Sequence, residues 1–312
     1  MTSIVVVGSL NMDLVALAPR LPSVGETLVG SRYFSVAGGK GANQAYAAAL
    51  LGGDVAMFGR VGDDDYGRQM RASLTEAGCD VTHVASLPGP SGVALITVAD
   101  SGQNTIIVVP GANDAYDVEQ VERDAVAFAG ARCALFQLET PLPTVIAAAR
   151  AAKTAGAQII LDPAPAPDTL PAELLSLVDI LTPNETEAAR LVGRSDTRLE
   201  RADAEAIARQ LQGRGCGIVI VKMGAQGCFV ADRDESHWVS APSVTARDTT
   251  AAGDVFNGAL AVALTEGAPL AKACAFAAEA ATLSVTRLGA QSSMPRRSEI
   301  AFLDELVGQT RA

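Results

Sequence analysis

The sequence is poor in the side chain that most often carries protons in enzymes. It contains two histidines, His83 and His237, among 312 residues, and neither belongs to a recognisable motif. A lone histidine outside a motif is more often a surface or core residue than a catalyst. If the protein is an enzyme that needs a general base, we therefore expect a carboxylate to supply it.

Cysteines are also few and scattered. Five occur, with no C-x-x-C pair and an odd total. This pattern argues against a disulfide scaffold or a zinc site and favours a reducing compartment. The apolar run at residues 4–7 is too short for a signal peptide, and no uncharged stretch reaches the length of a membrane span. We expect a soluble cytoplasmic protein.

Positive charge is in deficit. The chain contains 24 Lys and Arg residues and 35 Asp and Glu residues, which gives a formal net charge of −11. Such a charge repels nucleic acid and anionic membranes, so we expect neither as a partner. A local basic pocket remains compatible with this charge, because net charge describes the far field and not a cleft.

Aromatic residues make up only 4% of the chain, whereas 49% of it is hydrophobic and rich in Ala, Val, Leu and Gly. This composition is typical of layered α/β proteins. Short apolar runs that alternate with amphipathic segments predict a doubly wound, mostly parallel sheet with helices on both faces. The predicted strands are 4–7, 55–59, 133–138, 158–161, 178–181 and 217–221. The predicted helices are 41–51, 144–155, 185–191, 202–212, 253–265 and 270–285.

Two separated segments, about 13–36 and 91–110, have the pattern of exposed β structure. Proline and glycine punctuate the first, and the second contains a hairpin signal, Asp-Ser-Gly, between residues 92–99 and 104–109. No linker, internal repeat or charge block divides the chain. We predict one α/β domain over residues 1–312 that carries a small β appendage.

The sharpest local feature is residues 248–254, which read DTTAAGD and lead into a helix at about Gly253. Free amides in the first turn of a helix bind anions. Asp254 beside them could take a proton from a hydroxyl while the amides hold a phosphoryl group. It could equally be a first-turn acid that only favours the helix dipole.

Residues 38–44 read GGKGANQ, where the glycines allow close approach of a ligand to the backbone and Lys40 and Asn43 add donors. The segment lacks the spacing of a P-loop, and it could simply be a turn that enters a helix. Asn11 and Asp13 follow the first strand, and Glu139 follows strand 133–138. Side chains in such places face the ligand crevice of a parallel sheet, although a strand end can also be merely solvated.

Residues 184–187 read NETE and open a helix. Asn184 and Glu187 could form a capping box, or their oxygens could organise Mg²⁺ and its waters near phosphates. Either interpretation fits this segment taken alone.

Together these segments resemble the ribokinase family of carbohydrate kinases, the PfkB type, along essentially the whole chain. The segments around Gly39 and Asp254 are similar to the two signatures of the family, and Asn184 with Glu187 matches its N-x-x-E magnesium motif. Residues 8–13, 111–113 and 137–139, together with Lys40, Asn43 and Gln44, are most similar to members that phosphorylate ribose.

The resemblance implies an ATP-dependent kinase with Mg²⁺ and a monovalent cation, usually K⁺. It implies a base, Asp254, and an anion hole from the amides of Ala251, Ala252 and Gly253. The implied sugar ligands are Asn11, Asp13, Gly39, Lys40, Asn43, Glu139 and Asp254. The implied nucleotide and magnesium residues are Asn184, Glu187, Lys222, Gly224, Gln226, Gly227 and Gly253. The implied K⁺ site comprises Asp248, Thr250, Ser284, Arg287, Gly289 and Ser293. The β appendage would be a lid that closes over the sugar and pairs two subunits.

Three positions depart from the pattern of the family. Lys222 stands where Thr or Ser is frequent, Ala278 replaces a common polar residue near adenine, and Arg247 replaces an apolar residue beside Asp248. Rival substrates are 2-deoxyribose, other pentoses, ketohexoses and nucleosides. A sugar-binding regulator without activity is a further alternative, and the absence of G-x-G-x-x-G after the first strand argues against a dinucleotide-dependent oxidoreductase.

Overall fold

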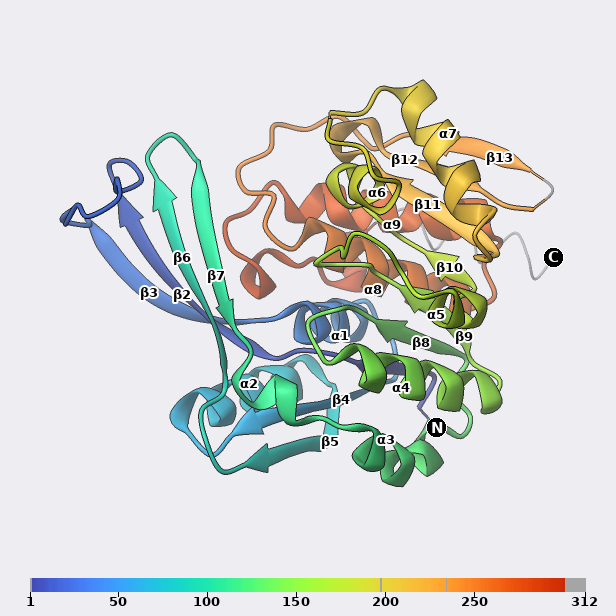
Figure 1. Ribbon diagram of the computed structural model, residues 1–312, viewed down its shortest axis with the longest axis horizontal. Helices are drawn as coiled ribbons and strands as arrows, with labels where there is room; N and C mark the ends of the chain where they lie inside the picture. The colour runs from blue at the N-terminus through green and yellow to red at the C-terminus, as the bar shows by residue number, and fades with distance from the viewer. Residues whose placement is uncertain (1, 197, 234, 301–312) are drawn as a thin grey trace.

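Nine strands form one large sheet in the computed structural model, which describes residues 2–196, 198–233 and 235–300 (Figure 1). The strand order is β13-β12-β11-β10-β9-β8-β1-β4-β5. Seven strands are parallel: β1 (Ile4–Val7), β4 (Val55–Gly62), β5 (Asp80–Leu87), β8 (Cys133–Phe136), β9 (Gln158–Leu161), β10 (Ile180–Leu181) and β11 (Ile218–Lys222). Antiparallel β12 (Cys228–Ala231) and β13 (Ser236–Val239) complete one edge. The predicted sheet is confirmed.

Helices cover both faces of this sheet, because alternate residues of each buried strand point to opposite sides. In β1, Ile4 and Val6 pack into one core cluster, and Val5 and Val7 pack into the other. The first cluster is covered by α1 (Lys40–Leu50), α2 (Asp65–Ala77), α8 (Ala252–Thr265) and α9 (Leu270–Ser284). The second is covered by α3 (Val118–Asp124), α4 (Leu142–Thr154), α5 (Ala172–Leu177), α6 (Glu185–Leu191) and α7 (Arg201–Gln212). Burying each such Val or Ile contributes roughly 1.5–3 kcal/mol.

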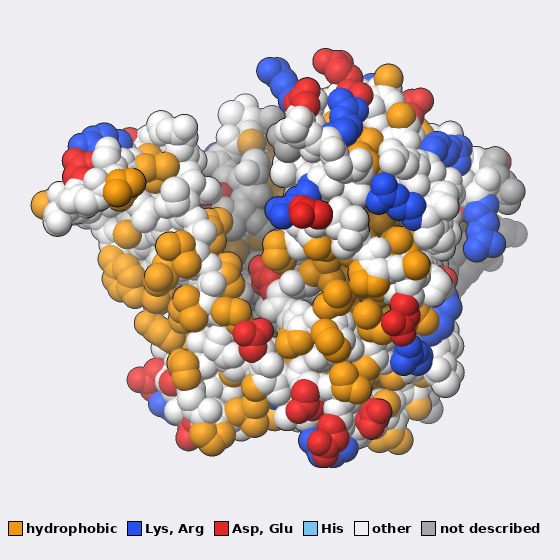
Figure 2. All heavy atoms as spheres, in the orientation of Figure 1, with side chains coloured by type: hydrophobic (Ala, Val, Ile, Leu, Met, Phe, Trp, Pro, Cys, Tyr) orange, Lys and Arg blue, Asp and Glu red, His pale blue; other side chains and the backbone are white. Residues whose placement is uncertain are grey.

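A separate four-stranded sheet projects from this body (Figure 1). Its order is β3 (Arg32–Gly38), β2 (Asn11–Ala18), β6 (Gly92–Ala99) and β7 (Asn104–Val109). The predicted β appendage is therefore confirmed, and its first segment is two strands separated by the irregular residues 19–31. Several large apolar side chains of this sheet are exposed, including Ile106 at 55% and Ile107 at 63%. Hydrophobic atoms accordingly gather over the projecting sheet (Figure 2).

Some elements differ from those predicted from the sequence. The sequence predicted neither α2 nor β5, and the strand predicted at 55–59 continues to Gly62. Strand 178–181 is shorter than predicted, with only Ile180 and Leu181 in the ladder. In β5 only Val84 is buried and the other residues are exposed or half-buried, because β5 is an edge strand. Within the described part of the chain, no helix is long and apolar enough to cross a membrane.

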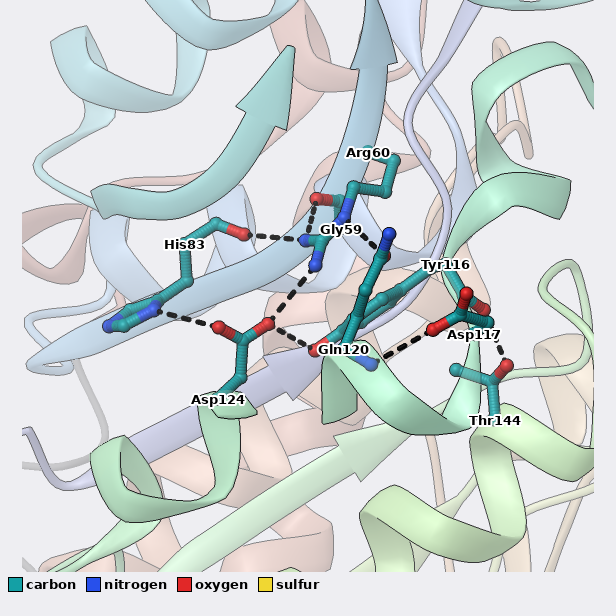
Figure 3. Close-up of polar contacts among 8 residues, drawn as sticks. All are labelled: Gly59, Arg60, His83, Tyr116, Asp117, Gln120, Asp124 and Thr144. Atoms are coloured by element: carbon teal, nitrogen blue, oxygen red, sulfur yellow. Dashed lines mark hydrogen bonds and ion pairs between the residues drawn. The ribbon is translucent and has the colours of Figure 1, made fainter. Parts of the chain in front are cut away.

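A buried polar cluster ties β4 and β5 to the segment that returns from the small sheet (Figure 3). The Arg60 guanidinium lies 3.9 Å from the centre of the Tyr116 ring, and its Nη2 lies 3.2 Å from Asp124 Oδ2. The Tyr116 hydroxyl donates to the same oxygen at 2.9 Å, and Nδ1 of His83 lies 3.6 Å from the other oxygen. His83 is therefore part of a structural cluster, and its ring stacks on Phe58.

Candidate active site

A cavity of about 420 Å³ opens at the carboxyl ends of the parallel strands. Asp162 follows β9 and Lys222 ends β11, while α1, α6 and α8 point their N-terminal turns at the same space. Open α/β sheets bind ligands at this edge, next to the strand where the order of connections reverses. Here that strand is β1, which lies between β8 and β4.

Asp254 lies in the first turn of α8, next to backbone amides that have no partner within the helix. The preceding Ala251 has φ 59°, the one left-handed non-glycine residue of the described ranges. This conformation is costly for alanine, and it turns the chain sharply into the helix. Asp254 is 6% exposed and faces the cavity.

The Asp254 carboxylate does not serve as a helix cap. Its Oδ2 accepts a hydrogen bond from Asn43 Nδ2 at 3.1 Å, and its Oδ1 accepts one from Gln44 Nε2 at 3.1 Å. Both partners come from α1, more than 200 residues away. Burial raises the pKa of Asp254 to about 6, and the nearby Lys40 charge opposes that rise. A carboxylate with this pKa is a competent general base near neutral pH.

Glu139 organises the predicted sugar ligands. Its Oε2 accepts hydrogen bonds from Ser9 Oγ at 2.6 Å, from Asn11 Nδ2 at 3.3 Å and from the Lys40 amide at 3.2 Å. The structure therefore brings Asn11, Lys40 and Glu139 together from three separate segments.

Asp13 belongs to the same group of acids. Its pKa is raised to about 7, first by burial and then by the charges of Glu139 and Asp254. Gly39 adjoins them with φ 89°, and a Cβ atom there would lie 2.6 Å from the Asn11 amide nitrogen. A larger residue would displace the strand that carries Asn11.

Two lysines face this set of acids. Burial by itself would lower the pKa of Lys40, but Asp254, Asp162 and further carboxylates outweigh it and hold that pKa above its usual value. Lys222 Nζ lies 3.0 Å from Asp162 Oδ1, and both side chains are nearly buried. The cavity thus combines acidic oxygens with two fixed cations, an arrangement suited to phosphate and metal ions together.

Asn184 and Glu187 form the capping box that the sequence allowed. The Asn184 amide donates to Glu187 Oε2 at 2.8 Å, and the Glu187 amide donates to Asn184 Oδ1 at 2.9 Å. Both residues also line the cavity, and burial raises the pKa of Glu187. The capping interpretation is confirmed, and the carboxylate and amide oxygens fit the ligand preference of Mg²⁺.

The predicted nucleotide loop follows β11. Gly224 lines the cavity and begins the short 3-10 helix η3 (Gly224–Gln226). Gly227 has φ 90°, and a Cβ atom there would lie 1.9 Å from the Val239 carbonyl oxygen. Gly227 is thus required by close packing against β13, and that packing fixes the loop beside the cavity. Ala278 of α9 is buried in the core.

The predicted K⁺ residues are only partly assembled by side-chain contacts. Asp248 Oδ1 accepts hydrogen bonds from Thr250, and its Oδ2 accepts one from the Gly289 amide at 2.8 Å. The hydroxyls of Ser284 and Ser293 donate to carbonyls of their own segments, and Arg287 pairs with Glu299. Arg247 is exposed. The loops that contain Asp248 and Gly289 are therefore adjacent. The side chain of Arg287 instead forms an ion pair with Glu299.

Sequence reasoning missed three residues of the site. Gln44 has no role of its own in the sequence prediction, yet its side chain forms hydrogen bonds with Asp254, Asp162 and Gln137. Ser9 and Asp162 were not singled out at all. Ser9 follows β1 and Asp162 follows β9, and a polar residue just after a parallel strand was the signal that could have identified both.

Comparisons with known proteins agree with this geometry. A family model described as pfkB family carbohydrate kinase matches residues 1–297. The chain is 42% identical over 307 residues to a ribokinase of Haemophilus influenzae, which covers 97% of this chain and 98% of the relative. It is 36% identical over 293 residues to a deoxyribokinase of Salmonella typhi, across 94% and 95% of the two chains. A solved structure of Arabidopsis thaliana ribokinase complexed with ribose and ATP has a TM-score of 0.89 and 36% identity, across 98% of this chain and 99% of that one.

Proposed function

The chain belongs to the pfkB family of carbohydrate kinases, and from that premise we propose that it transfers the γ-phosphoryl group of ATP to the 5-hydroxyl of D-ribose. The products are ribose 5-phosphate and ADP. One observation carries the proposal: the buried Asp254 carboxylate lies in the first turn of α8 and faces a cavity that Lys40 and Lys222 also line.

Asp254 acts as the general base. It accepts the proton of the primary hydroxyl while that oxygen forms a bond to the γ-phosphorus and the bond to the leaving ADP oxygen breaks. Asn43 and Gln44 hold the carboxylate in place by donating to its two oxygens. The amides of Ala251, Ala252 and Gly253 stabilise the charge on the phosphoryl oxygens, as helix N-termini do.

The sugar lies against the acids and amides gathered by Glu139. Carboxylates accept hydrogen bonds from hydroxyls, and the Asn11 and Asn43 amides both accept and donate. Asp13 and Asn43 provide partners for vicinal hydroxyls, which favours ribose. The deoxyribose alternative stays open because a deoxyribokinase is also similar along nearly the whole chain.

In the same proposal, Asn184 and Glu187 would hold Mg²⁺, and Lys222, Gly224, Gln226 and Gly227 would line the nucleotide. When bound, Mg²⁺ neutralises phosphate charge and orients the leaving group. The segment from Asp248 to Thr250 and the loop that contains Gly289 are joined by a hydrogen bond, and they would hold a monovalent cation, K⁺. That cation would support the turn that begins α8.

The small sheet serves as the lid over the sugar, and its exposed apolar face pairs two copies of the chain. Water must be excluded, since an open site would hydrolyse ATP. Ile106, Ile107, Val108 and Val109 give β7 a continuous exposed apolar run, which supports burial against a second copy. A cytoplasmic location fits the five free, buried cysteines.

A panel of sugars tests the proposed function. ADP production is measured with ribose, 2-deoxyribose, other pentoses, ketohexoses and nucleosides, each with K⁺ and with a bulky ammonium ion in its place. We expect the highest kcat/KM for ribose and activation by K⁺. A higher value for deoxyribose would reassign the substrate, and transfer to none of these acceptors would point to a binding protein without activity. Activity independent of K⁺ would rule out the proposed cation site but would leave the proposed kinase function standing.

A further inference from the structure

Lys222 and Asp162 form an ion pair inside the cavity. Lys222 Nζ lies 3.0 Å from Asp162 Oδ1, and the two side chains are 11% and 3% exposed. Surface ion pairs contribute little, but a nearly buried pair is costly to desolvate, so its position needs an explanation. Lys222 ends β11 and Asp162 follows β9, and β10 lies between those two strands.

The Lys222 ammonium lies against the N-terminus of α8. A Cβ atom built on Gly253 would lie 3.2 Å from Lys222 Nζ. Gly253 is one of the residues whose amides face the transferring phosphoryl group in the proposed function. The absence of a side chain at this position leaves room for the ammonium beside that group. An ammonium has three donors, and Asp162 uses one of them, so the others are available to phosphate oxygens.

Asp162 also connects to the base. Its Oδ2 accepts a hydrogen bond at 3.1 Å from Gln44 Nε2, the same nitrogen that donates to Asp254 Oδ1 at 3.1 Å. Gln44 is itself fixed by Gln137 Nε2, which donates to its Oε1 at 2.7 Å. A continuous chain of contacts therefore runs from Lys222 through Asp162 and Gln44 to Asp254.

We propose that Lys222 is a catalytic cation that stabilises the phosphoryl group in transit, and that Asp162 is the positioning residue that holds Lys222 above Gly253. The proposal rests on the proposed kinase function and assigns a role within the same site. Lys40 comes from α1 and Lys222 from β11, so the two cations reach the phosphoryl group from separate elements. Asp162 acts through Lys222 and does not itself touch the phosphate.

A double-mutant cycle on kcat tests this assignment. Lys222→Met should lower kcat about 100-fold with ribose, because one preorganised donor to the transition state is lost. Asp162→Asn should lower kcat about 10-fold, the scale seen when a supporting residue is removed. In the Lys222→Met background, Asp162→Asn should change kcat by less than about 2-fold, because Asp162 then has no cation left to position and Asn still offers an acceptor oxygen to Gln44. The KM for ribose should stay within about 3-fold throughout.

Two controls separate this role from a merely structural one. Lys153→Met removes the lysine of an exposed pair with Asp179 and should leave kcat unchanged. Lys222→Arg keeps a cation at the position and should recover part of the activity lost in Lys222→Met, which keeps the test decisive if Asp162→Asn does not fold.

The possible failures are distinct. Equal losses from Asp162→Asn in both backgrounds would overturn the positioning role and point to an independent function, such as binding the waters of the divalent cation. A Lys222→Met enzyme with wild-type kcat would overturn the catalytic role. An inactive wild-type protein would instead overturn the proposed function, since the cycle is measured only after ribose phosphorylation by the wild type.

Discussion

Asn43 and Asp254 lie 211 positions apart in the chain, and the Asn43 side-chain amide donates a 3.1 Å hydrogen bond to the Asp254 carboxylate. The bond joins the first turn of α1 to the first turn of α8. These helices pack on the same face of the large sheet, so their N-termini meet at its carboxyl edge. The proposed base is thereby held by the segment that is also expected to bind the sugar.

Replacing the base should separate binding from catalysis. Asp254→Asn keeps the size of the side chain but removes its ability to accept a proton, so kcat should fall by about 10³-fold or more. The Kd for ribose, measured by calorimetry, should change by less than about 3-fold. Near-wild-type turnover in this variant would show that another group accepts the proton.

Activity should depend on pH through the acids of the site. The pKa of Asp254 is raised to about 6, so the base is ionised above that pH and protonated below it. We expect kcat/KM for ribose to rise with pH and to level off between 7 and 8. Asp13, with a pKa of about 7, should steepen the rise. In Asp13→Asn, the slope of log kcat/KM against pH on the acid side should return to one. A profile that stays flat down to pH 5 would contradict both assignments.

The same shift predicts an effect on stability. Because burial raises the pKa of Asp254 from 3.8 to about 6, the folded protein binds the proton more tightly than the unfolded chain. The stabilising contribution of the proton is therefore present below pH 4 and is lost as the pH rises through 6. Asp254→Asn should raise Tm by several degrees at pH 8 and by much less at pH 4, as measured by thermal unfolding. A gain that is equal at both pH values would argue against a charged, desolvated Asp254.

Gly39 should tolerate no side chain. Gly39→Ala combines a left-handed φ of 89° with a Cβ atom 2.6 Å from the Asn11 amide nitrogen, so we expect destabilisation well above 1 kcal/mol and a raised KM for ribose. Gly52→Ala is a matched control, because Gly52 has φ 90° but open space around its Cβ position. Each substitution lowers the free energy of unfolding, which is measured with denaturant. The difference between the two losses gives the contribution of the steric clash. Equal effects would show that only φ strain matters at Gly39.

The apolar face of the small sheet should control assembly. Ile107→Lys places a charge on a side chain that is 63% exposed, where it would be buried in the proposed dimer. We expect this variant to be monomeric by light scattering at concentrations where the wild type is a dimer. Val126→Lys, on an 81% exposed residue outside this sheet, should leave the protein a dimer. A dimeric Ile107→Lys protein would place the interface elsewhere.

Local patterns were sufficient for much of the framework. The hairpin of β6 and β7 and the helix over residues 185–191 lie where the sequence predicted them, because turn residues and hydrophobic periodicity are local signals. Segments such as α2 and β5 escaped prediction. For α2 the signal was present, because Asp64 caps the helix, Met70 and Leu74 share its buried face and Gly78 ends it. For β5 it was weak, because this edge strand has no continuous buried run.

The sequence by itself determined which residue types were available to the site: the glycine-rich turn before α1, the small residues before α8, and carboxylates as the expected source of a base. The tertiary structure decided which of them meet. It turned Asp254 from a possible capping acid into a buried group held by Asn43 and Gln44. It also brought Asp162 to Lys222 across the sheet, a contact between residues 60 positions apart. Such contacts depend on strand order and helix packing, which are set by long-range burial and cannot be read from any single segment.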